Sequence, residues 1–261
     1  MEQPAGSREV LRVEGICKDI AGVRILDEVS LTVRAGERRA VIGPNGAGKT
    51  SLFRIIAGEM PPTRGRVFFM GEEVTRQPAY QRACKGMART FQQTAVFSEL
   101  TVLENVMLAC QQRRHPLLGL LQAVHRDRAT RHAAEQVLED WALSRWAGRP
   151  ARELPYGIQR RLELAMAFAR RPQLLLLDEP TAGLAAADVE ELVQRIAAIP
   201  RTVTVVFIDH NMKTVFSAAD RITVMHHGQV LAEGMPAEIR ENPAIQEAYL
   251  GVGGVARAVG G

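Results

Sequence analysis

The chain has 261 residues, of which 46% are hydrophobic and 24% are charged, so it can bury a core in one large domain or in a core with a subdomain. A net charge of +4 is too small to indicate nucleic-acid binding by itself. The longest apolar runs, such as 174–177 and 117–121, are far shorter than the ~20 residues that a membrane-spanning helix needs. Any role at a membrane would therefore depend on docking to other subunits.

The order of the predicted elements indicates an α/β fold. Alternating apolar and polar positions in the first 40 residues predict short antiparallel strands, and a hairpin around Gly71 is expected within 65–74. Between them, a strand at 40–42 leads into a helix at 50–57. Helical periodicity starts at Val102 and continues over 128–141 and 156–170, which predicts a mostly helical insertion at about 94–170. Apolar runs at 173–178 and 202–209, joined by a helix at 187–199, predict parallel strands that are buried on both faces.

A glycine-rich segment lies between the first of these strands and its helix. It fits the phosphate-binding pattern G-x-x-x-x-G-K-[ST] and is followed by a serine, so the candidate residues are Gly43, Pro44, Asn45, Gly46, Ala47, Gly48, Lys49, Thr50 and Ser51. The glycines let the backbone curl so that successive N–H groups point at phosphate oxygens, and the helix N-terminus adds partial positive charge. Lys49 would reach the β- and γ-phosphates and Thr50 would ligate Mg²⁺. The segment predicts binding of a nucleoside triphosphate.

Two acidic residues follow the apolar run 174–177. Asp178 and Glu179 would lie at the carboxyl edge of the sheet, where open α/β sheets bind their ligands. Asp178 is placed to hold Mg²⁺ through water, and Glu179 is placed to act as a general base on the attacking water. Together with the phosphate loop, these acids predict hydrolysis of the bound nucleotide.

With these motifs, the chain resembles the ATP-binding subunit of an ABC transporter, from about residue 8 to residue 250. The resemblance implies a P-loop (RecA-like) core with an N-terminal antiparallel β subdomain and a helical insertion. It divides the single domain at 8–250 into a catalytic core (about 8–93 and 171–235), a helical subdomain (about 94–170) and a C-terminal helical extension (about 236–250), ahead of a flexible tail at 251–261. Gln92 matches the family's Q-loop glutamine, which touches Mg²⁺ and the attacking water and reports on the membrane subunit. His210 matches the switch histidine that contacts the γ-phosphate.

The segment 154–159 occupies the position of the family's signature sequence and contributes Tyr156, Gly157 and Gln159 to the candidate site. In the family, the start of this helix caps the ATP that is bound to the opposite subunit. The resemblance thus implies a head-to-tail dimer with a second ATP-binding subunit, either identical or different, that holds ATP and Mg²⁺. It also implies two transmembrane permease subunits, an indirect link to a periplasmic or extracellular solute-binding protein, no nucleic acid, and a peripheral location on the cytoplasmic face of the cell membrane.

Several details resemble the branch that energises uptake of branched-chain and related amino acids. They are Tyr156-Gly157, the segment 160–165, the long helical insertion at 111–145 and the endings at 234–240 and 248–251. Urea importers and lipopolysaccharide exporters share this ending and remain alternatives. A soluble ABC-type ATPase is a more distant alternative because it usually carries two cassettes or a long coiled coil. A P-loop kinase or GTPase would not explain the signature-like segment.

Three positions depart from the family pattern. Ile20 stands where many members stack an aromatic residue on adenine, which predicts weaker adenine selectivity or a stacking group from elsewhere. Pro155 replaces the signature serine and offers neither a hydroxyl nor an N–H to a phosphate. Ala185 stands where many members have an aspartate. Because the chain's own site is intact, the last two losses predict a heterodimer with unequal ATP sites.

Overall fold

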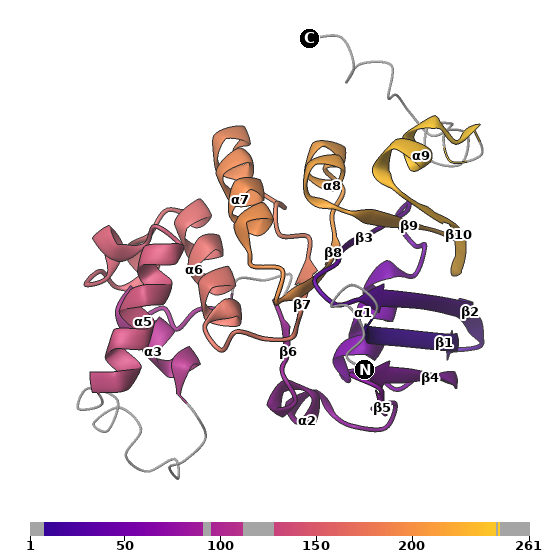
Figure 1. The fold of residues 1–261 in the computed structure, drawn as a ribbon, viewed down its shortest axis with the longest axis horizontal. Helices are drawn as coiled ribbons and strands as arrows, with labels where there is room; N and C mark the ends of the chain where they lie inside the picture. The colour runs from indigo at the N-terminus through magenta and orange to yellow at the C-terminus, as the bar shows by residue number, and fades with distance from the viewer. Residues whose placement is uncertain (1–7, 91–94, 112–127, 244, 246–261) are drawn as a thin grey trace.

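The computed structural model describes residues 8–90, 95–111, 128–243 and 245. An antiparallel sheet, in the order β2-β1-β4-β5, occupies one side of the molecule (Figure 1) and confirms the antiparallel strands and the hairpin around Gly71. Its strands are β1 (Glu9–Ile20), β2 (Val23–Arg34), β4 (Arg64–Phe69) and β5 (Glu72–Glu73). The first two are longer than expected, with 12 residues each. Shifts in their register indicate bulges, which increase twist and let long strands wrap a core.

The second sheet is the core of the α/β fold, and its order is β10-β9-β3-β8-β7-β6. All neighbours pair in parallel except β10, which is antiparallel to β9. The strands are β3 (Arg38–Ile42), β6 (Met87–Arg89), β7 (Leu174–Asp178), β8 (Thr204–Ile208), β9 (Arg221–His226) and β10 (Gln229–Gly234). Every residue of β3, β7 and β8 is buried, as the apolar runs predict. The sequence analysis did not single out β6, β9 or β10.

The core sheet separates two hydrophobic clusters, because successive side chains of a strand point to opposite faces. Leu174 and Leu176 pack in the cluster that includes α1 and the antiparallel sheet. Leu175 and Leu177 pack in the cluster that includes the helices of the other face. Alternate residues of one apolar run therefore belong to two cores, which explains why the run lacks polar positions.

Helices cover both faces of the core sheet (Figure 1). They are α1 (Lys49–Ala57), α2 (Ala79–Cys84), α3 (Val102–Cys110), α5 (Arg128–Asp140), α6 (Tyr156–Phe168), α7 (Ala186–Ala198), α8 (Met212–Ala218) and α9 (Pro236–Glu241), with 3₁₀ turns at Ser144–Trp146 and Ala151–Glu153. The helices predicted at 50–57, 128–141, 156–170 and 187–199 are confirmed to within two residues at each end. Within the described ranges, no helix has both the length and the hydrophobicity to cross a bilayer.

The helices α3, α5 and α6 form the predicted helical insertion on the side of Figure 1 away from the antiparallel sheet. Helix α3 begins at a capping box, in which Thr101 Oγ1 accepts from the Glu104 amide and Glu104 accepts from the Thr101 amide. The rings of Trp141 and Phe168 pack 6.0 Å apart and join the end of α5 to the end of α6. The division of the chain into subdomains stays a prediction, and the tail at 251–261 lies outside the described residues.

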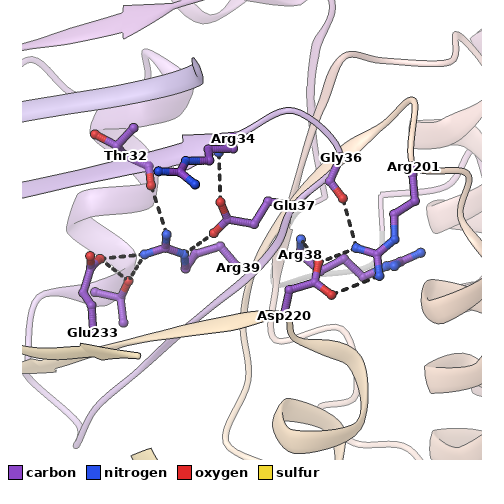
Figure 2. A network of polar contacts seen from close by, with 10 residues as sticks. Thr32, Arg34, Gly36, Glu37, Arg38, Arg39, Arg201, Asp220 and Glu233 are labelled. Carbon is purple, nitrogen blue, oxygen red and sulfur yellow. Dashed lines mark hydrogen bonds and ion pairs between the residues drawn. The ribbon is translucent and has the colours of Figure 1, made fainter. Parts of the chain in front are cut away.

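A buried polar network ties the two sheets together (Figure 2). The guanidinium of Arg39 in β3 forms ion pairs of 2.6 Å with Glu37 and with Glu233 of β10. It also donates to the Thr223 hydroxyl in β9 and to the backbone carbonyl of Thr32 in β2. One side chain thus joins strands from both sheets, at the end of β3 opposite to the phosphate loop.

Candidate active site

The carboxyl ends of three parallel strands bring the candidate residues together. Ile208 of β8 pairs in register with Val41 of β3 on one side and with Asp178 of β7 on the other. The segments that leave these strands therefore start side by side. They are the phosphate loop, the acidic turn at 178–180 and the histidine segment at 209–211, so residues far apart in the sequence share one edge of the sheet.

The phosphate loop has the backbone that its glycines predict. Gly46 and Gly48 have φ of 81° and 94°, and Gly48 begins α1 without a side-chain cap, so the N-terminal N–H groups stay available for an anion. A Cβ on Gly43 would lie 2.2 Å from the carbonyl oxygen of Met225, and one on Gly48 would lie 2.6 Å from Leu26 Cδ2. Glycine is therefore required at both positions by close packing as well as by φ.

The other loop positions surround this backbone. Asn45 and Gly46 are exposed at the tip of the loop, whereas Ala47 is buried and its carbonyl accepts from the Gly228 amide. Thr50 and Ser51 lie in the first turn of α1 and are partly buried. The loop is thus fixed at its base and open at its tip, as a phosphate cradle must be.

Lys49 is a buried cation at the start of α1. Its Nζ donates to the carbonyls of Gly43 and Pro44, at 2.7 and 2.9 Å. Burial lowers the pKa of Lys49, and the negative charges of Glu179 and Asp178 oppose that shift. The lysine and the two acids are therefore close enough to interact electrostatically.

Asp178 is fully buried, and one of its carboxylate oxygens is unsatisfied. Its Oδ2 accepts from Arg89 at 2.8 Å, whereas the buried Oδ1 has no hydrogen-bond partner. Burial raises the pKa of this carboxyl, while the ion pair with Arg89 opposes the rise. An unpartnered anionic oxygen at the same edge of the sheet as the phosphate loop fits Mg²⁺, which binds few protein oxygens and keeps waters and phosphate oxygens as its other ligands. Among the described residues, no cluster of three or more His, Cys, Asp or Glu offers a complete protein cage for a metal.

Glu179 and His210 form a contact across the edge. Nε2 of His210 lies 2.7 Å from Oε1 of Glu179, and both side chains are partly exposed. Glu179 has a left-handed φ of 47°, which costs a non-glycine residue on the order of 1 kcal/mol. Its amide donates to the Ile208 carbonyl at 2.9 Å, so the neighbouring strand helps to hold this conformation. The arrangement presents an oriented carboxylate to the space in front of the phosphate loop.

The signature residues do not join this site within the chain. Helix α6 begins at Tyr156, with Pro155 as an N-cap that forms no side-chain hydrogen bond, and it lies on the far side of the core strands from α1 (Figure 1). The Tyr156 hydroxyl donates to the carbonyl of Ala182, and the Gln159 amide donates to the carbonyl of Leu154. A Cβ on Gly157 would meet the Asp188 carboxylate at 2.8 Å.

The remaining candidate positions are placed as follows. Gln92 lies outside the described residues. Ile20 is exposed at the end of β1, and Ala185 is an exposed N-cap of α7 without a side-chain hydrogen bond. Neither a proline nor an alanine side chain can form a hydrogen bond, so Pro155 and Ala185 leave the N-termini of α6 and α7 without a side-chain cap.

Three contacts of this edge were missed by the sequence analysis. They are the Arg89–Asp178 ion pair, the donation from the Thr181 hydroxyl to Asp209 at 2.7–2.8 Å, and the contacts of Arg160 with the acidic turn. Arg89 ends the short strand β6 beside β7, and recognising that strand would have placed it near Asp178. Arg160 gives no such signal, because a charged residue in a helix is ordinarily solvated.

Two protein families match parts of the sequence, and similar proteins match most of it. A family described as ABC transporter matches residues 26–182, and one described as branched-chain amino acid ATP-binding cassette transporter matches residues 229–255. The chain is 41% identical over 254 residues to the high-affinity branched-chain amino acid transport ATP-binding protein BraF of Pseudomonas aeruginosa, covering 94% of this chain and 99% of BraF. It is 38% identical over 252 residues to the corresponding protein LivG of Escherichia coli, again covering 94% and 99%.

Solved structures agree with this result. The ADP conformation of MJ1267, an ATP-binding cassette of an ABC transporter, matches with a TM-score of 0.83 and 30% identity, covering 94% of this chain and 100% of that one. A dimeric post-hydrolysis state of the ATP-binding cassette MJ0796, bound to ADP and Pi, matches with a TM-score of 0.73 and 25% identity, covering 87% and 98%. The α/β fold predicted from the sequence is thereby confirmed.

Proposed function

The chain belongs to the ABC transporter family, in its branched-chain amino acid (LivG/BraF) type, and from this premise we propose that it is the ATP-hydrolysing subunit of an importer for branched-chain or related amino acids. The observation that carries the proposal is the end-to-end match to BraF, which covers 94% of this chain. The edge described above supplies the chemistry that this role requires. If the complex does not transport amino acids, import of urea or of another solute, or export of lipopolysaccharide, becomes the favoured alternative.

In this proposal the phosphate loop and Lys49 bind the triphosphate. The loop amides and the α1 N-terminus receive phosphate oxygens, and Lys49 exchanges its contacts with the Gly43 and Pro44 carbonyls for the β- and γ-phosphates. Thr50 and the free Oδ1 of Asp178 would hold Mg²⁺, which when bound neutralises charge on the phosphates. The partly lost solvation of Lys49 favours the exchange, because a phosphate is a stronger partner than a carbonyl.

Glu179 acts as the general base in this reading. The His210 contact at 2.7 Å holds one oxygen of the Glu179 carboxylate. The carboxylate thus keeps its orientation toward the attacking water, from which it accepts a proton. Gln92 is proposed to contact the same water and metal. Tyr156, Gly157 and Gln159 are proposed to serve the nucleotide of a second ATP-binding subunit, since α6 lies away from the chain's own phosphate loop.

In this proposal the energy of hydrolysis is passed to membrane permease subunits. A groove of about 540 Å³ runs between α2 and β6 on one side and α3 and α6 on the other, and it is lined by the exposed ring of Tyr80 and by Leu108 and Met166. Arg89, which lines this groove, forms ion pairs with Glu59 and with the buried Asp178. We assign this groove to a cytoplasmic helix of a permease subunit, at the cytoplasmic face of the membrane. Binding of that helix would alter the environment of Asp178, the carboxylate proposed to hold Mg²⁺.

The test uses the tagged chain purified from native membranes in mild detergent, with mass spectrometry of its partners. We expect two permeases and a second ATP-binding subunit, and ATPase activity that falls by about 10²–10³-fold in Glu179→Gln while ATP binding persists. The same complex in vesicles should take up radiolabelled leucine only with ATP present. An active complex that carries no amino acid would refute the substrate assignment, whereas wild-type turnover by Glu179→Gln would refute the role of Glu179.

A further inference from the structure

Arg160 is a fully buried arginine that the proposed chemistry does not use. It lies in α6 with 1% of its surface exposed. A guanidinium so completely removed from water must have its donors satisfied by specific acceptors, because burying an unpaired charge is very costly. The contacts of Arg160 therefore indicate its role.

The acceptors are the carbonyl oxygens of the acidic turn. Arg160 donates from its NH2 group to the Asp178 and Glu179 carbonyls, at 3.0 and 3.1 Å, and from Nε to the Pro180 carbonyl at 3.2 Å. Its charge is balanced within α6 by Glu163, which accepts from NH1 at 2.5 Å. One planar guanidinium thus spans three successive carbonyls, a fork geometry that a lysine cannot reproduce.

These contacts act where the backbone is strained. Glu179 is held at a φ of 47°, and its carbonyl accepts both from Arg160 and from the Ala182 amide at 3.1 Å. Without an external hold, a non-glycine residue tends to leave this region of φ and ψ. Such a change in the φ and ψ of Glu179 would reorient its side chain.

The face of α6 that carries Arg160 also contacts the residues that follow the acidic turn. Tyr156, Gly157 and Arg160 share a face because they are spaced three and four residues apart. Tyr156 contacts the Ala182 carbonyl and Gly157 packs on Asp188, so this face rests on residues 178–188. The beginning of α6 and the acidic turn therefore form one connected unit.

We infer that Arg160 is a positioning residue for hydrolysis, which holds the turn at 178–180 so that Glu179 faces the attacking water. The inference rests on the proposed function, in which Glu179 is the base. The first turn of α6 is proposed to meet the nucleotide of the second subunit. A shift of α6 would therefore be transmitted through Arg160 to Glu179, the base of this chain's own site. The relay requires no contact between Arg160 and the substrate.

The test compares Arg160→Gln and Arg160→Lys with Arg161→Gln in the full complex. Arg161 is the matched control, because it is the next residue of α6 and buried, but it pairs with Glu191 of α7. We expect Arg160→Gln to lower kcat by about 10- to 100-fold with KM for ATP within about twofold of wild type, Arg160→Lys to restore part of the loss, and Arg161→Gln to stay near wild type.

Two further readouts separate positioning from a general loss of structure. Hydrogen exchange at the Glu179 and Ala182 amides should accelerate in Arg160→Gln while exchange in β8 is unchanged. In a Glu179→Gln background, Arg160→Gln should cause no further loss of turnover, since it acts through that side chain. If Arg160→Gln destabilises the chain because it removes the ion pair with Glu163, the double variant Arg160→Gln/Glu163→Gln removes both charges of that pair and carries the test.

Either of two results would overturn the inference. One is an active wild-type complex in which the folded Arg160 variants keep wild-type kcat, and the other is an equal loss of kcat in Arg161→Gln. An inactive wild-type complex would instead refute the proposed function, so the two failures are distinguishable.

Discussion

Replacing Arg39 by methionine should destabilise the chain strongly without touching its chemistry. Arg39 is almost fully buried and ion-paired to Glu37, which is also buried, and to Glu233, whose side chain is 29% exposed. Methionine keeps most of the volume but leaves the Glu37 carboxylate without its cation. Removing one partner of a buried pair costs about 3–5 kcal/mol, and we take the lower part, about 3–4 kcal/mol, because Glu233 reaches water.

The assay is thermal unfolding followed by circular dichroism. For a domain of this size, 1 kcal/mol lowers Tm by about 2–4 °C, so Arg39→Met should lower it by about 6–16 °C. Arg131→Met is the control, since its pair with Glu135 is half exposed and worth only about 0.3–0.5 kcal/mol. Adding Glu37→Gln to Arg39→Met should recover at least half of the loss, because no buried charge then remains unpaired.

Activity supplies the second arm of this experiment. Arg39 lies at the start of β3, whereas the phosphate loop follows the other end of this strand. Well below the transition, Arg39→Met should therefore keep kcat within about twofold of wild type. A Tm shift as small as that of Arg131→Met would refute the energetic argument, and a large loss of kcat in the folded variant would refute the separation of this network from the site.

Two further predictions concern the nucleotide site. Burial raises the pKa of Asp178, so the folded state binds its proton more tightly than the unfolded state and loses stability as pH rises from 3.8 through the raised pKa. The Tm of the wild-type chain should therefore fall more steeply over this pH range than the Tm of Asp178→Asn, and an equal pH dependence of Tm in the two proteins would contradict this. Ile20→Tyr should tighten ATP binding by about tenfold, since base stacking is worth about 1–3 kcal/mol. Val23→Tyr, across the hairpin turn, serves as the control, and an unchanged affinity of Ile20→Tyr for ATP would contradict a stacking role for this position.

The sequence by itself determined the elements that carry local or periodic signals. The phosphate loop could be predicted because its glycines, Lys49 and Thr50 act through the backbone of one short segment. The apolar runs ending at Asp178 and Ile208 could be predicted as buried parallel strands because charged residues are absent from β7 before Asp178 and from all of β8. The position of Glu179 after the first of these runs predicted its role as the general base, and resemblance supplied the role of His210. The structure places these two side chains in contact.

Only the tertiary structure decided which charges are buried and against what. Short strands such as β6 carry too few residues for a periodic signal, and so the position of Arg89 beside Asp178 could not be read from the sequence. The burial of Arg39, Arg160 and Asp178 depends on partners 18–194 residues away in the chain. Such contacts follow from how sheets and helices pack, because a charged side chain is buried only where folding brings an acceptor to it.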